Sequence, residues 1–154
     1  MRSLSKSIAA ARFSRLSVQL GELVIGQAQI VLAPLNITPR DYDALRCIAQ
    51  GQGLSQQELG KLMGIFSSRM VALIDELERR GLVIRTVSTA DRRRYVLSLT
   101  KGGEALLLQA DMLAEKLHHT LFGDVTDDET ARMQALVDRL ALLPCAVDPL
   151  RTEP

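Results

Sequence analysis

The sequence predicts a mainly α-helical protein with one small β-hairpin. Aromatic residues make up only 3% of the 154 residues and tryptophan is absent, so the core must be built from aliphatic side chains. Most apolar residues recur at helical spacing, and an alternation with period two is confined to one short stretch after the middle of the chain. With 47% hydrophobic and 24% charged residues, the composition is that of a globular protein about the size of one ordinary domain.

Two helices are predicted in the first third of the chain. Residues 4–33 carry one broad apolar stripe at helical spacing, and Pro34 ends it. The next helix has a clear start, because Thr38 is a good N-cap, Pro39 suits the first helical position and Asp41 places a carboxylate in the first turn. The sequence "GQG" ends this second helix.

Two short-linked helices follow, in "LSQQELGKLMG" and "IFSSRMVALIDELERRG". Ser55 and Glu58 are spaced as a capping box, and Leu59 and Leu62 are expected to form the buried face of the first. The second is amphipathic, and Gly81 is its terminal glycine. We expect its buried face to consist of Met70, Leu73, Ile74 and Leu77. Together the pair predicts a helix-turn-helix.

A β-hairpin with a basic tip is predicted directly after the helix-turn-helix. The stretches "LVIRTV" and "YVLSL" have the strand period, and "STADRRR" between them combines turn formers with three successive arginines. A charge run in a turn is often only a solvated loop. Here it completes the layout of a winged helix, in which one helix enters the DNA major groove and a basic loop enters the minor groove.

The remainder of the chain predicts two more helices. Thr100 is expected to cap a long helix that runs to about Phe122. Thr126 and Glu129 form a further capping box, and the helix after it ends before Pro144.

The stretch from "LSQQELGKLMG" to "LTKGGEALL", residues 54–107, resembles the winged-helix core of the MarR family of bacterial transcription regulators. The matching pieces are the Leu-Ser helix start, the recognition helix ending in "LERRGLV", the "DRR" of the wing and the "LTKGGEALL" that leads into a long helix. They cover about a third of the chain, in the family's order and spacing. The resemblance implies a DNA-binding regulator that dimerises through helices from both chain ends.

The resemblance also implies roles for residues of the wing. The family's Asp-x-Arg motif falls on Asp91 and Arg93, so Arg93 is expected in the minor groove and Asp91 is expected to orient the arginines. Arg92 and Arg94 are additional basic groups, expected to reach flanking phosphates.

Other DNA contacts are expected from the two central helices. In the recognition helix these are Ser67, Ser68, Arg69 and Ala72, with Arg69 reaching a guanine. At the start of the preceding helix they are Ser55, Gln56 and Gln57, for which simple capping is the alternative.

The recognition helix departs from the family pattern at two places. Phe66 stands where relatives often have aspartate, and Val71-Ala72 replaces the usual Ser-Arg pair. Shape readout by the wing is therefore expected to contribute more to specificity.

The charges are distributed unevenly along the chain, which indicates different roles for its two parts. Residues 1–101 carry 15 Lys/Arg and 8 Asp/Glu, whereas residues 102–154 carry 4 and 10, although the total is only +1. We therefore expect an N-terminal helix in residues 1–36 that belongs to the dimerisation region. A winged-helix DNA-binding domain is expected in residues 37–100, with dimerisation helices and a tail in residues 101–154.

Several other features carry weaker hypotheses. His118 and His119 point about 100° apart on a helix and are not expected to bind a metal ion. Cys47 and Cys145 form no metal or disulfide pattern, and Cys47 is expected to be a small buried residue, with a redox role as the alternative. No catalytic constellation is present, so neither an enzyme nor a cofactor is predicted. The glutamines and the proline of "LVIGQAQIVLAPL" are expected to keep it well short of a membrane span.

The function predicted is a homodimeric, sequence-specific transcription regulator that binds a pseudo-palindromic site on double-stranded DNA in the cytoplasm. The resemblance further implies a repressor that a small, aromatic or phenolic effector relieves. Phe13, Arg46, Cys47 and Met112 are positioned to border an effector cleft, with a core role as the alternative for each. The alternative function is a protein-interaction or architectural module that uses the winged helix without reading sequence.

Overall fold

The computed structural model describes residues 2–51, 53–87 and 94–141, and it confirms the mainly helical fold with one hairpin. The chain divides into two compact units, residues 1–118 and residues 119–154. In chain order the elements are α1 (Arg2–Leu32), the 3-10 turn η1 (Ala33–Leu35), α2 (Pro39–Gln50), α3 (Gln56–Leu62), α4 (Ser67–Arg79), β1 (Val83–Val87), β2 (Tyr95–Leu99), α5 (Lys101–Phe122) and α6 (Asp127–Ala141).

The helix starts are built as their sequences predict. Thr38 caps α2, with its hydroxyl accepting from the Asp41 N–H at 3.1 Å while the Asp41 carboxylate accepts from the Thr38 N–H at 2.8 Å. The same reciprocal pair caps α6, between Thr126 and Glu129. Each box satisfies backbone donors that the first helical turn leaves without an intrahelical partner.

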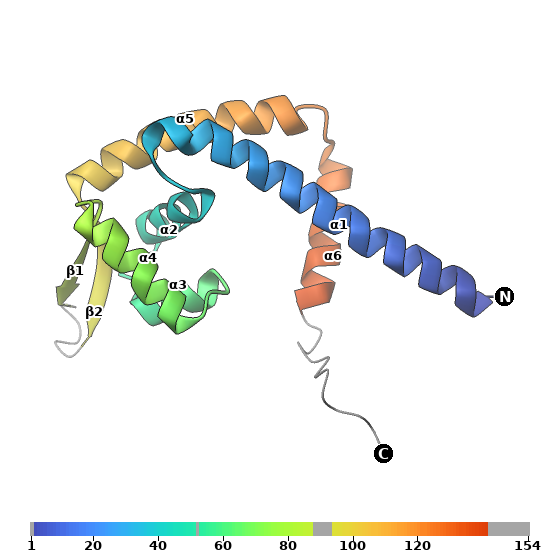
Figure 1. The fold of residues 1–154 in the computed structure, drawn as a ribbon, viewed down its shortest axis with the longest axis horizontal. Coiled ribbons are helices and arrows are strands. Elements are labelled where there is room, and N and C mark those ends of the chain that lie inside the picture. The colour runs from blue at the N-terminus through green and yellow to red at the C-terminus, as the bar shows by residue number, and fades with distance from the viewer. Residues whose placement is uncertain (1, 52, 88–93, 142–154) are drawn as a thin grey trace, which may run out of the picture. The chain divides into compact units, whose positions relative to one another are not determined.

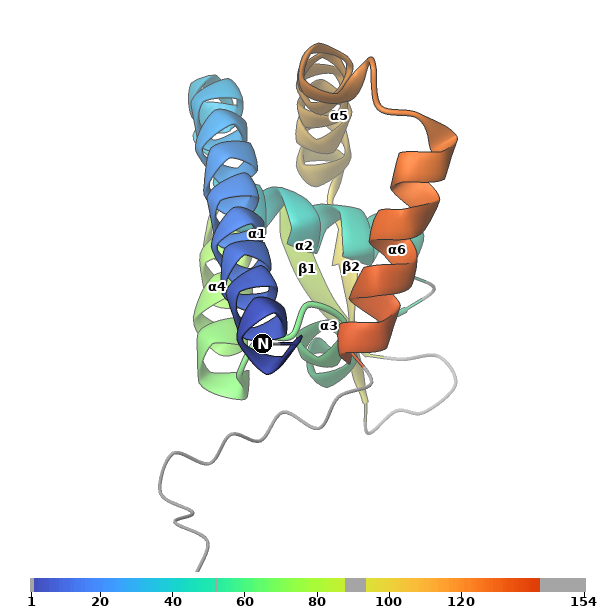
Figure 2. The same ribbon diagram turned by 90° about the vertical axis from the view of Figure 1, so that its right-hand side faces the viewer.

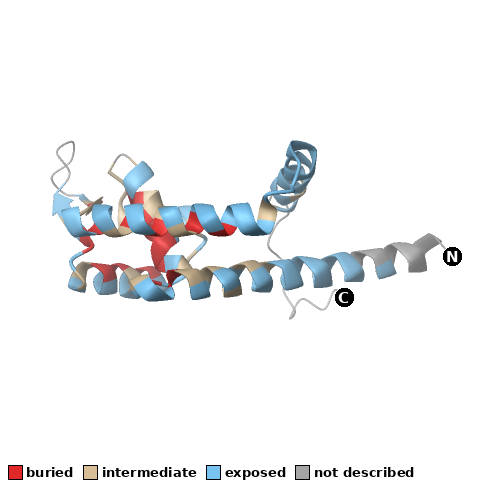
Figure 3. Ribbon diagram, turned by 90° about the horizontal axis from the view of Figure 1, so that it is seen from above, coloured by how far each residue is buried: buried red, intermediate tan, exposed pale blue. Residues whose placement is uncertain are grey.

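One aliphatic core holds α2, α3, α4, the hairpin and the beginning of α5 together. Figure 3 shows in red the buried residues that form this core, which come from α2 to α5 and from the C-terminal end of α1. The largest fully buried side chains are Leu45, Leu59, Met70, Ile74, Leu77 and Val83. The face predicted for α4 is thus confirmed, with Leu73 only partly buried against the core. The prediction for Leu62 was wrong: it is 65% exposed at the last residue of α3, whereas Leu59 before it is fully buried and Met63 and Ile65 after it pack against the core.

The two strands pair antiparallel, with Val83 opposite Leu99 and Val87 opposite Tyr95. Leu97 faces the core, and its N–H donates to the carbonyl of Leu54, in the segment before α3, at 2.8 Å. Figures 1 and 2 show the N-terminal end of α4, α3 and the far ends of β1 and β2 on the same side of the first unit.

The junction between α4, the hairpin and α5 is closed by a clasp around Thr100. Its hydroxyl donates to the Gly81 carbonyl at 2.6 Å and accepts from the Gly103 N–H at 3.0 Å, while its own N–H donates to the Leu82 carbonyl at 3.0 Å. A Cβ on Gly103 would lie 2.0 Å from that same carbonyl oxygen, so the backbones meet at a distance that only glycine permits.

Helix α1 is much more exposed than the other helices of the first unit. Its exposed large apolar side chains are Ile8, Phe13, Leu16, Val18, Leu20, Leu23, Ile25 and Ile30. The expectation that this segment falls well short of a membrane span was wrong by length and composition: Ala11–Leu35 is long and apolar enough to cross a membrane, and only 6% of an apolar 18-residue window within it is buried. Length and apolar composition are shared by helices that pack on another protein chain, so they do not identify a membrane anchor.

Candidate nucleic-acid interface

The residues predicted to read bases lie on the solvent face of α4. Ser67, Ser68, Arg69 and Ala72 are all exposed, while the opposite face of the same helix is buried in the core. An amphipathic helix packed on one side can present the other to a partner without disturbing the fold. The exposed side begins at the first helical residue, which is the end that recognition helices direct at base edges.

The start of α3 is closed by its own capping groups. The Ser55 N–H and hydroxyl both donate to the Glu58 carboxylate, at 2.8 and 2.9 Å, and the Glu58 N–H donates back to the Ser55 hydroxyl at 3.3 Å. The capping alternative for Ser55 is therefore confirmed. Of its neighbours, Gln57 is exposed and Gln56 is half-buried, with its side-chain oxygen accepting from Arg85 at 3.1 Å.

Arg94 joins the hairpin to the same capping box, because its guanidinium donates to the Glu58 carboxylate. The hydrogen bonds from Ser55, and then that from Arg94, lower the pKa of Glu58 from 4.5 to about 2. The Arg94 guanidinium is thus ion-paired with a residue of the same chain. The predicted wing residues Asp91, Arg92 and Arg93 lie outside the described residues.

Arg85 of β1 is a positioning residue that the sequence analysis missed. Its side chain, 26% exposed, donates to Asp75 at 2.5 Å, to Glu78 and to Gln56, so it joins β1 to both α4 and α3. Burial acts to lower the pKa of Arg85, but its hydrogen bonds to Asp75 and Glu78 outweigh this and raise it. The hairpin and the two central helices are therefore held in one arrangement on the side that carries the predicted DNA contacts.

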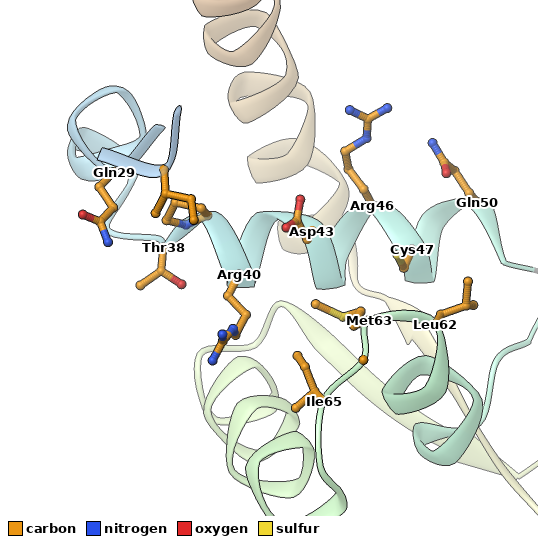
Figure 4. A pocket seen from close by; sticks show the side chains of 13 residues that line it. Gln29, Thr38, Arg40, Asp43, Arg46, Cys47, Gln50, Leu62, Met63 and Ile65 are labelled. Atoms are coloured by element: carbon orange, nitrogen blue, oxygen red, sulfur yellow. The ribbon is translucent and has the colours of Figure 1, made fainter. Parts of the chain in front are cut away.

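A hollow of about 780 Å³ lies between α1, α2 and the α3–α4 turn. Arg46 and Cys47 line it, as the expected effector cleft requires, whereas Phe13 and Met112 are not among its lining residues. Figure 4 shows Cys47 pointing from α2 towards Leu62 and Met63 of the turn, and Arg46 pointing to the other side of α2. Cys47 is a half-buried free thiol.

Arg46 also takes part in a polar cluster between α2 and α5. The Tyr42 hydroxyl donates to the Asp111 carboxylate at 2.7 Å and accepts from the Arg46 guanidinium at 3.1 Å. Burial and the hydrogen bond to Asp111 raise the pKa of Tyr42. This cluster links one wall of the hollow to the long helix α5.

Together, the helix-turn-helix, the antiparallel hairpin after it and the exposed polar start of α4 define a winged-helix DNA-binding fold. The MarR family model matches residues 37–95. A putative transcriptional regulatory protein for the hcr operon of Thauera aromatica is 31% identical over 113 residues, which cover 73% of this chain and 68% of the relative. The chain belongs to the MarR family, and this curated relative is described as a transcriptional regulator.

Two solved structures of regulators named CouR agree with this assignment. CouR from Rhodococcus jostii RHA1 bound to p-coumaroyl-CoA has a TM-score of 0.79 and 30% identity, and the match covers 88% of this chain and 95% of CouR. The transcriptional repressor CouR bound to a 23-mer DNA duplex has a TM-score of 0.71 and 30% identity, over 81% and 89% of the two chains.

Proposed function

We propose that the protein is a homodimeric transcription repressor that binds a pseudo-palindromic operator in the cytoplasm and is released from it by a small effector. Sequence-specific DNA binding is supported above all by the exposed face at the start of α4, which consists of Ser67, Ser68, Arg69 and Ala72. CouR, which has the same fold, has been solved on a DNA duplex and is named a repressor. In this proposal residues 37–100 make the DNA contacts, and residues 1–36 and 101–154 serve dimerisation.

Dimerisation is supported by apolar surface that the single chain leaves exposed. In α1 this surface runs over most of the helix, and α6 separately exposes Met133, Val137 and Leu140. Exposed apolar surface of this extent in a soluble regulator marks a protein interface. Two-fold symmetry then places the two α4 helices on half-sites about one helical turn, ~34 Å, apart.

The hollow beside α2 is the proposed effector site. Arg40 lines it beside apolar side chains of the α3–α4 turn, and Arg46 lines it with its guanidinium on the other side of α2. A cation next to apolar side chains suits an aromatic or phenolic compound that carries negative charge. The structure of CouR with p-coumaroyl-CoA shows that a regulator of this fold takes a phenolic ligand. Release from DNA follows if the effector favours a conformation with lower DNA affinity.

Selection from random duplex DNA at about 0.15 M salt tests the function. We expect a palindromic consensus with half-sites one helical turn apart, bound at least ~10³-fold more tightly than random duplex. The Arg69→Ala variant is expected to relax the preference at one base pair of each half-site and to leave the spacing unchanged. Enrichment of A·T-rich duplex without a consensus would instead identify an architectural protein, and no retained DNA a protein-interaction module. The selected operator then serves to screen phenolic compounds for release.

A further inference from the structure

Phe66 is an exposed aromatic residue at the start of the helix that faces DNA. Its side chain is 79% exposed, the largest exposed fraction among the exposed large apolar residues that the structure describes. It occupies the N-cap of α4, where its carbonyl accepts from the Met70 N–H at 3.0 Å. The chain has only three phenylalanines, and this one is mostly exposed to solvent next to the predicted base-reading residues.

The position is unfavourable for a phenylalanine in the isolated protein. The backbone of Phe66 has the extended conformation of an N-cap (φ −61°, ψ 144°), which suits Ser, Thr, Asp or Asn, yet its side chain makes no capping hydrogen bond. The ring also leaves its apolar surface in water. The ring neither caps α4 nor joins the core, so its apolar surface is available to a partner.

The surroundings of the ring indicate the chemistry of that partner. Phe66 borders a hollow of about 470 Å³ between α3 and α4, which is also lined by the polar side chains of Gln56, Gln57, Lys61 and Ser67, by the half-buried Ile65 and by two glycines. An exposed aromatic ring beside amides, a hydroxyl and an ammonium group, with one half-buried isoleucine, does not match a wholly apolar protein surface. It does match the DNA major groove, where thymine methyl groups lie among hydrogen-bonding base edges and between phosphates.

We propose that Phe66 is a specificity-determining residue that contacts the 5-methyl group of a thymine in each half-site. The inference rests on the proposed function, since it requires α4 to enter the major groove. The N-cap is the first residue of such a helix to meet base edges, and an apolar side chain distinguishes thymine by its methyl group. Phe66 thereby adds a base contact at a position where the family pattern often has aspartate.

The test replaces the thymines of the selected operator with deoxyuridine, one half-site position at a time. Deoxyuridine lacks only the 5-methyl group and keeps the same base pairing. At one position the wild-type protein is expected to bind about fourfold more weakly per half-site, which corresponds to one buried methyl group. The Phe66→Ala variant should bind thymine and deoxyuridine duplexes equally at that position, as measured by fluorescence anisotropy at ~0.15 M salt.

The matched control is Ile84→Ala, which shortens an exposed apolar side chain outside α4 and outside the proposed effector site. It should keep the wild-type preference for thymine. A wild-type protein indifferent to every deoxyuridine substitution would overturn the proposal, as would a preference that survives Phe66→Ala and so belongs to another residue such as Ala72. An equal loss on specific and random duplex in a folded Phe66→Ala protein would also contradict it. Failure of the proposed function is a separate outcome, because the unmodified operator would then show no selective binding at all.

Discussion

The neighbouring helices α3 and α4 begin in opposite ways. The start of α3 is closed: Ser55 and Glu58 satisfy each other's backbone N–H groups, and Arg94 of the hairpin adds a third partner. The start of α4 is open, because its N-cap Phe66 offers no side-chain acceptor and its first-turn side chains are exposed.

The difference separates a structural end from a binding end. At the start of α3 the N–H groups of Ser55 and Glu58 are already satisfied, whereas the open first turn of α4 leaves its donors to a partner. Changes at Ser55 and Glu58 should therefore act through folding and the position of the hairpin. Changes at the start of α4 should act on DNA binding and leave the fold intact.

The largest effect is expected when the link between the two helices is removed. Arg85→Ala leaves the carboxylates of Asp75 and Glu78 without the guanidinium that joins them to Gln56 and β1. Because the arginine is largely buried, we expect the free energy of unfolding to fall by about 1–3 kcal/mol. The affinity for operator DNA and the affinity for random duplex DNA should both fall, because the hairpin is no longer held against α3 and α4. Urea unfolding and anisotropy titrations measure the two effects.

The control for that variant is Arg79→Ala, which removes an exposed pair with Glu76 on the same helix. Such pairs contribute between zero and about 1 kcal/mol, so little change is expected. Equal losses in Arg85→Ala and Arg79→Ala would show that the Arg85 cluster does not position the hairpin.

An intermediate effect of opposite sign is expected at the two N-caps. Ser55→Ala should lower the free energy of unfolding by about 1 kcal/mol, since the cap of α3 is lost. Phe66→Ser should raise it by about 0.5–1 kcal/mol, since it gives α4 the cap that it lacks. Thermal unfolding of both variants compares the two helix starts directly. A loss of stability in Phe66→Ser would mean that the ring supports the fold.

The smallest effect is a pH dependence of the folding stability that comes from Glu58 of α3. The pKa of Glu58 is about 2 in the folded protein and 4.5 in the absence of its partners. Its ionised form therefore stabilises the fold above about pH 5, and this contribution is lost as the pH falls from 4.5 towards 2. The melting-temperature advantage of the wild type over Glu58→Gln should shrink across that range. A constant difference from pH 7 to pH 3 would contradict the assignment.

The local features of the fold could be predicted because each depends on residues close together in sequence. The N-cap at Thr38 and the capping boxes at Ser55 and Thr126 each pair residues three positions apart, and Gly81 has the positive φ, 68°, that a helix-terminating glycine favours. Leu62 was assigned wrongly because helical spacing continues to the last residue of α3, whereas the contacts with the core pass to Met63 and Ile65 of the following turn.

The contacts that position the site could not be predicted in the same way. Arg85 meets Gln56 across 29 residues and Arg94 meets Glu58 across 36, so no local pattern pairs them. As a result the sequence predicted Arg94 to be one more basic residue of the wing. In the structure its guanidinium donates to the Glu58 carboxylate. The composition of α1 likewise did not indicate how much of its apolar surface would stay exposed.

The clasp around Thr100 limits how this DNA-reading unit can be transplanted. Thr100 ties the end of α4 to the first turn of α5, and Leu107, Ala110 and Ala114 of α5 complete the same core as α2 and α4. A chimera that joins another partner helix directly after the hairpin would open this core and leave the Gly81 carbonyl without the Thr100 hydroxyl that donates to it. The smallest portable unit therefore carries about four turns of α5 with it, and a foreign helix is best joined beyond Ala114.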